Sequence, residues 1–167
     1  MKKVGIILGI LALVLVLSGC GKSVSEKAVE KAIEAQSGGK ANVDINSGNV
    51  KVETEEGMME SGTDVKLPSD FPSDVFVIDG EIKAAISDQA SGGFTISIET
   101  EKTVEEVNAL YKEKLESEGW KITATMNFSG MTSTTGEKDD RTVSVAISKA
   151  GSDTKTNAVV SVIKQQN

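Results

Sequence analysis

The chain has 167 residues, 18 of them basic and 25 acidic, and its formal net charge of −7 offers no basic surface for nucleic acid. It contains no histidine and a single cysteine. This composition excludes Ser-His-Asp and Cys-His nucleophile schemes, histidine-rich zinc sites and internal disulfide bonds.

The first twenty residues combine a positive start, an apolar run and a short motif that ends in cysteine. Lys2 and Lys3 precede an apolar run over residues 4–17; it has 14 residues, whereas a membrane-spanning helix needs about 20. Gly19 and Cys20 end the sequence Leu-Ser-Gly-Cys, which has the form of a lipobox. We therefore expect signal cleavage between Gly19 and Cys20 and lipidation of the cysteine. The alternative is an ordinary secretory signal with a cysteine near the cut.

Cleavage would remove residues 1–19 with two lysines, and 16 basic against 25 acidic residues would remain, a net charge of −9. A chain with this negative charge is not attracted to anionic lipid headgroups. Its attachment to a membrane therefore depends on acyl chains. A covalent diacylglycerol on Cys20 supplies two chains, enough for stable anchoring. We expect a cell-membrane lipoprotein on the extracytoplasmic face. In a Gram-negative host we expect the outer membrane, because Gly21 is not the aspartate that favours inner-membrane retention.

The region after the lipobox predicts a helix followed by a hairpin. Residues 26–36 have helical periodicity, and a Ser-x-x-Glu capping box begins at Ser23. Residues 43–46 and 50–53 alternate apolar and polar side chains around Ser-Gly, a pattern typical of a β-hairpin. Residues 20–55 are therefore predicted to form a small α-β-β unit that carries the lipidated cysteine.

The next segment, residues 56–74, contains both prolines of the chain, Pro68 and Pro72. Proline fixes its own φ and pushes the preceding residue toward extended geometry. We expect a stiff connector between two units, with Leu67 and Phe71 packed against a neighbouring core.

Residues 75–167 predict the main domain. The expected strands are residues 81–87, 94–98, 120–128, 131–135, 143–147 and 159–163. A helix over residues 103–118 opens with a capping box of Thr103 and Glu106, and Gly119 follows its end. The predicted fold class is α+β: an antiparallel β-sheet packed by one amphipathic helix in the order ββαββββ, preceded by the α-β-β unit.

The predicted core lies at the junction of this helix with the following strand. Val107, Leu110, Tyr111 and Leu115 form an apolar stripe at helical spacing. Trp120 follows directly, and we expect it to anchor the helix on the sheet.

Residues 67–72 read L-P-S-D-F-P, and residues 107–120 follow the pattern V-x-x-L-Y-K-x-x-L-x-x-x-G-W. Together these motifs resemble a module of small bacterial lipoproteins of uncharacterised type. The resemblance covers about residues 66–165 and implies two strands, a helix ending at the Gly-Trp junction, and further strands. It implies no catalytic residue set and no cofactor. Leu110 stands where the family usually has a second aromatic residue.

Two polar clusters have both a functional and a structural interpretation. Asp44, Asn46 and Asn49 offer oxygen ligands for calcium, but their spacing fails the EF-hand pattern and a hairpin turn explains them better. The four acids at 53, 55, 56 and 60 suggest a divalent-ion site, although a solvated strand edge explains them better. We therefore predict no metal site.

Asp139 and Asp140, beside Arg141, have the residue types of an acid/base pair for glycoside cleavage. A polysaccharide cleft would offer several aromatic side chains, which this chain lacks, so no catalytic residue and no enzyme is predicted. Met58 and Met59 are interpreted as a short buried strand rather than as an adaptable contact surface.

Two functions remain. The first is a non-catalytic, lipid-anchored envelope module whose partners are the membrane and an envelope protein or the cell wall. Its contacts are expected at the sheet edges and residues 68–72. The alternative is a small-ligand or ion-binding envelope lipoprotein with a pocket between sheet and helix. A dry core without convergent polar groups favours the first, and a cleft with buried acids favours the second.

Overall fold

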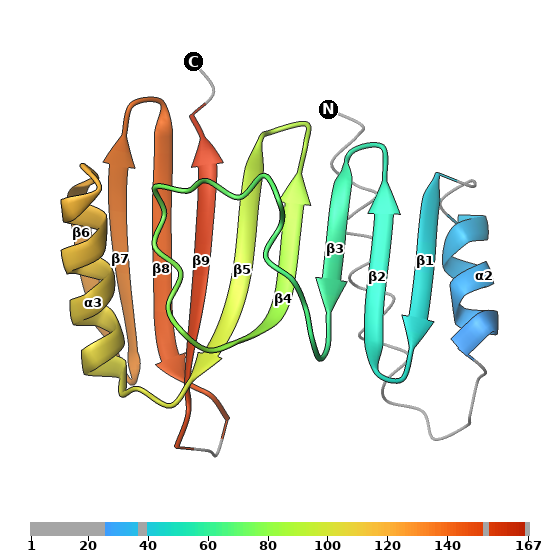
Figure 1. Ribbon diagram of the computed structural model, residues 1–167, viewed down its shortest axis with the longest axis horizontal. Helices are drawn as coiled ribbons and strands as arrows, with labels where there is room; N and C mark the ends of the chain where they lie inside the picture. Colours follow the sequence, from blue (N-terminus) through green and yellow to red (C-terminus); the bar gives the residue numbers. More distant parts are fainter. Residues whose placement is uncertain (1–25, 37–39, 152–153, 166–167) are drawn as a thin grey trace.

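A computed structural model describes residues 26–36, 40–151 and 154–165 of the chain (Figure 1). The predicted signal peptide, Gly19 and Cys20 lie outside the described residues, as does the capping residue Ser23. The two described helices are α2 (Glu26–Gln36) and α3 (Val104–Ser117). The described strands are β1 (Ala41–Asn46), β2 (Asn49–Thr54), β3 (Gly57–Ser61), β4 (Glu81–Asp88), β5 (Gly93–Thr100), β6 (Lys121–Phe128), β7 (Met131–Lys138), β8 (Arg141–Lys149) and β9 (Thr156–Lys164).

All nine strands belong to one antiparallel sheet in the order β1-β2-β3-β4-β5-β9-β8-β7-β6. The predicted fold class is therefore wrong, because the chain does not form a ββαββββ domain behind a separate α-β-β unit. The described part is mostly sheet, and its two helices account for only 15% of the chain. Figure 1 shows the sheet running from α2 at one side to α3 at the other.

Strand β3 is the reason for this correction. The predicted connector, residues 56–74, contains β3, whose residue Met59 pairs with Val52 of β2 on one side and with Ile86 of β4 on the other. A side chain at Gly57 would collide with the carbonyl of Ser87, so glycine allows β3 to lie close to β4. The strand predicted at Met58 and Met59 is confirmed, although both side chains are half-buried rather than buried. This strand joins the two predicted units into one sheet.

The apolar residues change face where β3 meets β4. Because directly paired residues point to the same side of a sheet, the register assigns each side chain to a face. The pairs Val43–Val52, Val52–Met59 and Met59–Ile86 define one face, which α2 covers. The other face is defined by Glu60, which pairs with Ala85 at the edge of the main core.

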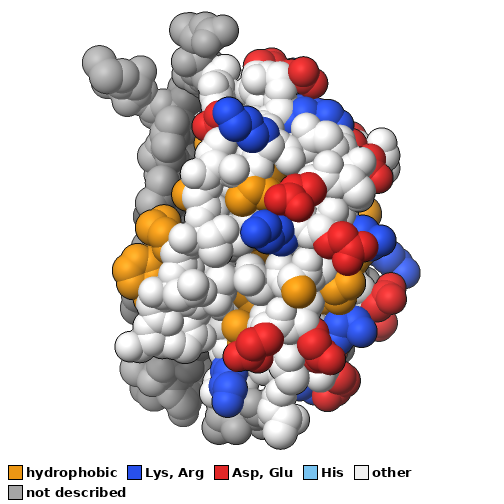
Figure 2. Space-filling model, turned by 90° about the vertical axis from the view of Figure 1, so that its left-hand side faces the viewer, with side chains coloured by type: hydrophobic (Ala, Val, Ile, Leu, Met, Phe, Trp, Pro, Cys, Tyr) orange, Lys and Arg blue, Asp and Glu red, His pale blue; other side chains and the backbone are white. Residues whose placement is uncertain are grey.

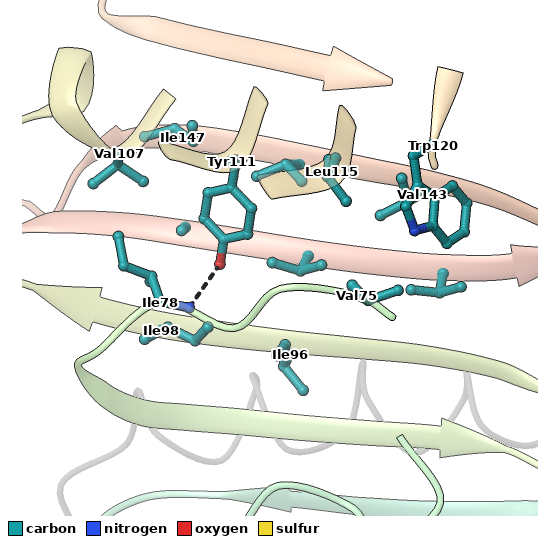
Figure 3. Packing of buried hydrophobic residues seen from close by; sticks show 14 of the residues in the cluster. Val75, Ile78, Ile96, Ile98, Val107, Tyr111, Leu115, Trp120, Val143 and Ile147 are labelled. Carbon is teal, nitrogen blue, oxygen red and sulfur yellow. Dashed lines mark hydrogen bonds between the residues drawn. The ribbon is translucent and has the colours of Figure 1, made fainter. Parts of the chain in front are cut away.

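On that second face, β4, β5, β9, β8 and β7 hold the main core. The register runs through the pairs Ala85–Ile96, Ile96–Val160 and Val160–Val145, and all four side chains are fully buried. Helix α3 lies over the β8 and β9 end of this row with Val107, Tyr111 and Leu115 (Figure 3). The sixteen buried residues of this cluster make it the larger of the two described cores.

The smaller core lies between α2 and the first strands. Its four buried members are Ile33, Ala41, Val43 and Val52. Helix α2 also protects the outer edge of β1, because the backbone N–H of Ile45 donates to Glu30 Oε1 at 2.8 Å and that of Val43 donates to Glu34 Oε1 at 3.5 Å. An edge strand leaves such groups unpaired, so these two carboxylates replace a neighbouring strand.

Local sequence determines where α3 begins and ends. The Thr103 hydroxyl accepts a hydrogen bond from the Glu106 N–H at 3.2 Å, and the Glu106 carboxylate accepts one from the Thr103 N–H at 2.8 Å. This predicted capping box is confirmed. At the other end Gly119 has φ +86°, and Trp120 N–H donates to the Leu115 carbonyl at 2.9 Å. The left-handed glycine lets β6 start immediately.

Candidate interaction site

The segment between β3 and β4, residues 62–80, crosses the face of the sheet that carries the main core (Figure 1). We call it the crossing segment. Its two prolines each begin a turn: the Phe71 N–H donates to the Pro68 carbonyl at 3.0 Å, and the Val75 N–H donates to the Pro72 carbonyl at 3.1 Å. These two turns, together with the fixed φ of each proline, restrict the path of the segment.

Aromatic and apolar side chains attach the crossing segment to the core. Phe71 meets Phe94 of β5 edge-to-face at 5.7 Å between ring centroids, and Phe76 meets Tyr111 of α3 in the same way at 5.3 Å. The buried Tyr111 hydroxyl accepts a hydrogen bond from the backbone N–H of Ile78 at 3.4 Å, drawn as the dashed line in Figure 3. The predicted packing of Phe71 against a core is confirmed. Leu67 was predicted to pack in the same way, but it is 40% exposed.

A charged cluster fixes the middle of the crossing segment to the β7–β8 hairpin. The Asp74 carboxylate accepts two hydrogen bonds from the Arg141 guanidinium, at 2.9 and 2.7 Å, and one from Lys138 Nζ at 2.7 Å. The Asp74 carbonyl accepts a fourth from Trp120 Nε1 at 2.8 Å. Lys138 Nζ also donates to the Glu118 carbonyl at the end of α3. One aspartate thus joins three elements.

Trp120 lies beneath the two cations of this cluster. The Arg141 guanidinium carbon is 5.0 Å from the centroid of the indole ring, and Lys138 Nζ is 6.0 Å away. Both distances suit a cation–π interaction. Hydrogen bonds from Arg141 and then Lys138 hold the pKa of the Asp74 carboxyl well below its usual range, against the opposing effect of burial. Asp74 therefore stays ionised at neutral pH.

An open groove of about 570 Å³ lies between the crossing segment and the C-terminal half of α3. Its lining comes from residues 67–69, residues 71–73, residues 75–77, Lys114 and Glu118. One wall is thus rich in proline and aromatic side chains. The other wall carries the positive Lys114 of α3 and the negative Glu118 at the C-terminal end of that helix. Figure 2 shows acidic, basic and hydrophobic side chains interspersed on the side of the molecule where α3 lies. We call this the connector groove.

The structure places four of the predicted junction residues in the main core. Val107, Tyr111 and Leu115 are fully buried, and Trp120 is 2% exposed. Leu110 packs at the margin of the core. In the described part of the chain every buried side-chain nitrogen or oxygen has a hydrogen-bond partner.

The predicted polar clusters take structural positions. Asp139 and Asp140 are the exposed turn residues of the β7–β8 hairpin, and their neighbour Arg141 binds Asp74. The amide oxygen of Asn49 accepts a hydrogen bond from the Thr63 N–H at 2.6 Å, next to the predicted turn. Among the described residues, no group of three or more acids, cysteines or histidines is arranged to hold a metal ion.

The sequence did not predict the Asp74 cluster. Asp74 and Arg141 are 67 residues apart, and each belongs to a different predicted unit. In the run Asp139-Asp140-Arg141, the sequence indicated possible chemistry for the two acids and predicted no partner for the arginine. The two aspartates directly precede the only arginine of the chain, and this arginine was the available signal for an ion pair with a distant carboxylate.

A family model described as START domain-like matches residues 82–158. The match begins at the second residue of β4 and ends within β9, so it includes α3 and excludes α2 and β1–β3. Searches among curated proteins and among solved structures each found no match. The described helices are all too short or too polar to cross a membrane.

Proposed function

We propose that this protein is a lipid-anchored, non-catalytic interaction module on the extracytoplasmic face of a bacterial cell membrane. The anchor is a diacylglycerol on Cys20, exposed by cleavage after Gly19. In a Gram-negative host the membrane is the outer membrane. The resemblance of residues 66–165 to small bacterial lipoproteins supports this proposal.

The connector groove is the observation that carries the interaction role. It lies outside a closely packed core, and the Asp74 cluster and the two aromatic pairs fix one of its walls. A rigid wall needs little ordering when a partner binds, and this lowers the entropic cost of association. A core of closely packed buried side chains beside a preformed external groove favours a macromolecular partner over an enclosed small molecule.

The lining of the connector groove indicates the chemistry of the partner. Leu67 and Phe76 offer exposed or half-exposed apolar surface, and Lys114 with Glu118 offers both charge signs at the rim. These features suit an extended segment of an envelope protein that places an apolar side chain against Leu67. Flanking polar groups of that segment would pair with the α3 side chains.

Cross-linking in living cells with the native lipidated protein, followed by mass spectrometry, tests the proposal. We expect a reproducible envelope protein that is lost with Leu67→Ser and weakened by Lys114→Glu. Ile163→Ser is the matched control, because Ile163 is 50% exposed but lies on β9 away from the groove. The absence of any reproducible partner, or equal loss with all three variants, would overturn the interaction role.

The match to a START domain-like family favours a second candidate, a small-ligand-binding lipoprotein. Native mass spectrometry of the purified lipidated protein distinguishes the two. A small molecule retained in stoichiometric amount, and lost with Phe76→Ala but not with Ile163→Ser, would support ligand binding in the groove and contradict the protein-partner proposal.

A further inference from the structure

The direction of the strands places two features at the same end of the sheet. Because all neighbours are antiparallel, β1 and β6, first and ninth in the sheet order, run in the same direction. The β1–β2 turn and the β6–β7 turn therefore lie at one end, which we call the lower end, as it is in Figure 1. The turns β2–β3 and β7–β8 lie at the opposite, upper end.

Helix α2 begins at the lower end. Its Glu30 bonds to the N–H of Ile45, near the end of β1, and Glu34, one turn later, bonds to that of Val43. The helix therefore runs antiparallel to β1, and Glu26 lies toward the β1–β2 turn.

The predicted lipid anchor is therefore tied to this end. Cys20 precedes Glu26 by six residues, and six residues span at most about 20 Å. An eight-residue strand such as β6 is about 27 Å long. A tether shorter than the strands cannot carry the acyl chains from the lower end as far as the upper end.

The lower end also carries exposed apolar side chains. Phe128 is 59% exposed and Met131 is 40% exposed, and the two flank the β6–β7 turn. They line a hollow of about 250 Å³ together with Glu105 and Lys149, among others. We call residues 128–131 the hairpin tip. An aromatic and a thioether side chain next to a lysine suit the boundary between acyl chains and headgroups.

Two turns at the upper end are acidic. Its β2–β3 turn consists of Glu55 and Glu56, and its β7–β8 turn consists of Asp139 and Asp140. Four carboxylates at these turns are repelled by anionic lipids. The hairpin tip has no charged residue between Phe128 and Met131. The hairpin tip therefore differs in charge from the two acidic turns at the upper end.

We infer that the lower end faces the lipid bilayer and that the hairpin tip enters its interfacial layer as a second contact. This inference rests on the proposed lipid anchor at Cys20. The two attachment points lie near opposite edges of the sheet, at its lower end. Together they fix the orientation of the domain, whereas a single anchor would leave the domain free to rotate. The upper end and its acidic turns then point away from the membrane.

Fluorescence quenching in lipid vesicles tests this orientation. The full lipidated protein is purified with Ser129→Cys or with Glu55→Cys, both exposed turn positions at opposite ends. Each variant is labelled with nitrobenzoxadiazole, because the lipidated Cys20 does not react. The vesicles contain phosphatidylcholine, a minority of phosphatidylglycerol, and a lipid spin-labelled near the top of its acyl chain. We expect about two-fold quenching at position 129 and little change at position 55.

Added Phe128→Ser and Met131→Ser substitutions should reduce the quenching at position 129, with unchanged emission from the buried Trp120 as a check on folding. No quenching at position 129 in a protein whose mass shows lipidation would overturn the orientation alone. Equal or stronger quenching at position 55 would do the same. An unmodified Cys20, read from the mass, would overturn the anchor and the orientation together.

Discussion

The two parts of the sheet bury opposite faces. Strands β1–β3 turn Val43 and Val52 toward α2, whereas β4–β9 turn Ala85 and Ile96 toward α3 and the crossing segment. The ladder of hydrogen bonds nevertheless continues from β3 to β4 without interruption. Backbone pairing therefore extends a sheet even where the hydrophobic core changes sides, and strand order and burial are separate properties of this molecule.

The two parts also differ in how they are stabilised. The main core has sixteen buried residues and the small core has four, so the apolar area removed from water is much greater in the first. The small part compensates by pairing β3 with β4 and by capping the edge of β1 with Glu30 and Glu34. Its stability is therefore expected to depend on the main part.

Trp120→Ala should give the largest effect, because it removes the side chain on which the main core and the Asp74 cluster meet. We expect the free energy of unfolding to fall by about 3–5 kcal/mol. Urea denaturation followed by circular dichroism measures this change. Trp120→Phe retains a ring but loses the bond to the Asp74 carbonyl, so a smaller loss is expected. A transition unchanged by the alanine variant would show that this junction does not stabilise the fold.

A matched pair of valines tests the comparison between the two parts directly. Val145 on β8 is fully buried in the main core, and Val43 on β1 is buried in the small core. Val145→Ala should lower the global stability by about 2 kcal/mol, and Val43→Ala by about 1 kcal/mol or less. Hydrogen exchange should show that Val43→Ala increases opening of β1 and β2 alone. Equal global losses would mean that both parts unfold as one unit.

Local features of both parts could be predicted from the sequence because short-range chemistry determines them. The capping box at Thr103 and the glycine at 119 define α3, and the Ser47-Gly48 turn defines the first hairpin. Pairing of β3 with β4 could not be predicted in this way. Met58, Met59 and Glu60 do not alternate, and residues 62–80 separate β3 from β4 in the sequence.

The candidate site was predicted only in part, for the same reason. The prolines at 68 and 72 indicated a stiff segment, and the structure shows a turn at each. The pairing of Asp74 with Lys138 and Arg141 depends on the three-dimensional path of that segment over the sheet. No spacing in the sequence predicts this contact, because the sheet brings Asp74 close to Lys138 and Arg141, which are far from it in the chain.

Asp74→Asn should destabilise the main part by about 1–2 kcal/mol at pH 7, because charge-assisted hydrogen bonds to Arg141 and Lys138 are weakened. The folded-state pKa of Asp74 lies below its ordinary value of 3.8. This contribution is therefore present above that value and is lost as the pH falls through the folded pKa. Thermal melts should show the gap between wild type and variant narrowing below about pH 4.

Asp70→Asn is the matched control for this pH series, since Asp70 lies exposed in the same crossing segment. Its melting temperature should follow that of the wild-type protein at every pH. A gap for Asp74→Asn that stayed constant down to pH 2 would mean that the carboxylate charge does not hold the segment, and that burial of Val75 and Ile78 suffices.

Tyr111→Phe should give the smallest effect, a loss of about 1 kcal/mol at neutral pH, because the Ile78 N–H loses its acceptor. Burial raises the pKa of Tyr111 to about 12, against the opposing effect of the Ile78 bond. The phenol of the unfolded chain ionises near pH 10. The stability due to the neutral phenol is therefore present below that pH and is lost as the pH rises toward 12.

Since Tyr111 is the only tyrosine, its ionisation can be followed by absorbance in the folded protein. An ionisation midpoint well above 10 is expected, together with a steeper alkaline loss of stability in the wild type than in Tyr111→Phe. A midpoint near 10 would mean that water reaches the phenol and that the crossing segment opens over α3. The main part would then resemble the small part, with one wall of its core only loosely attached, and the contrast between the two parts would be one of size alone.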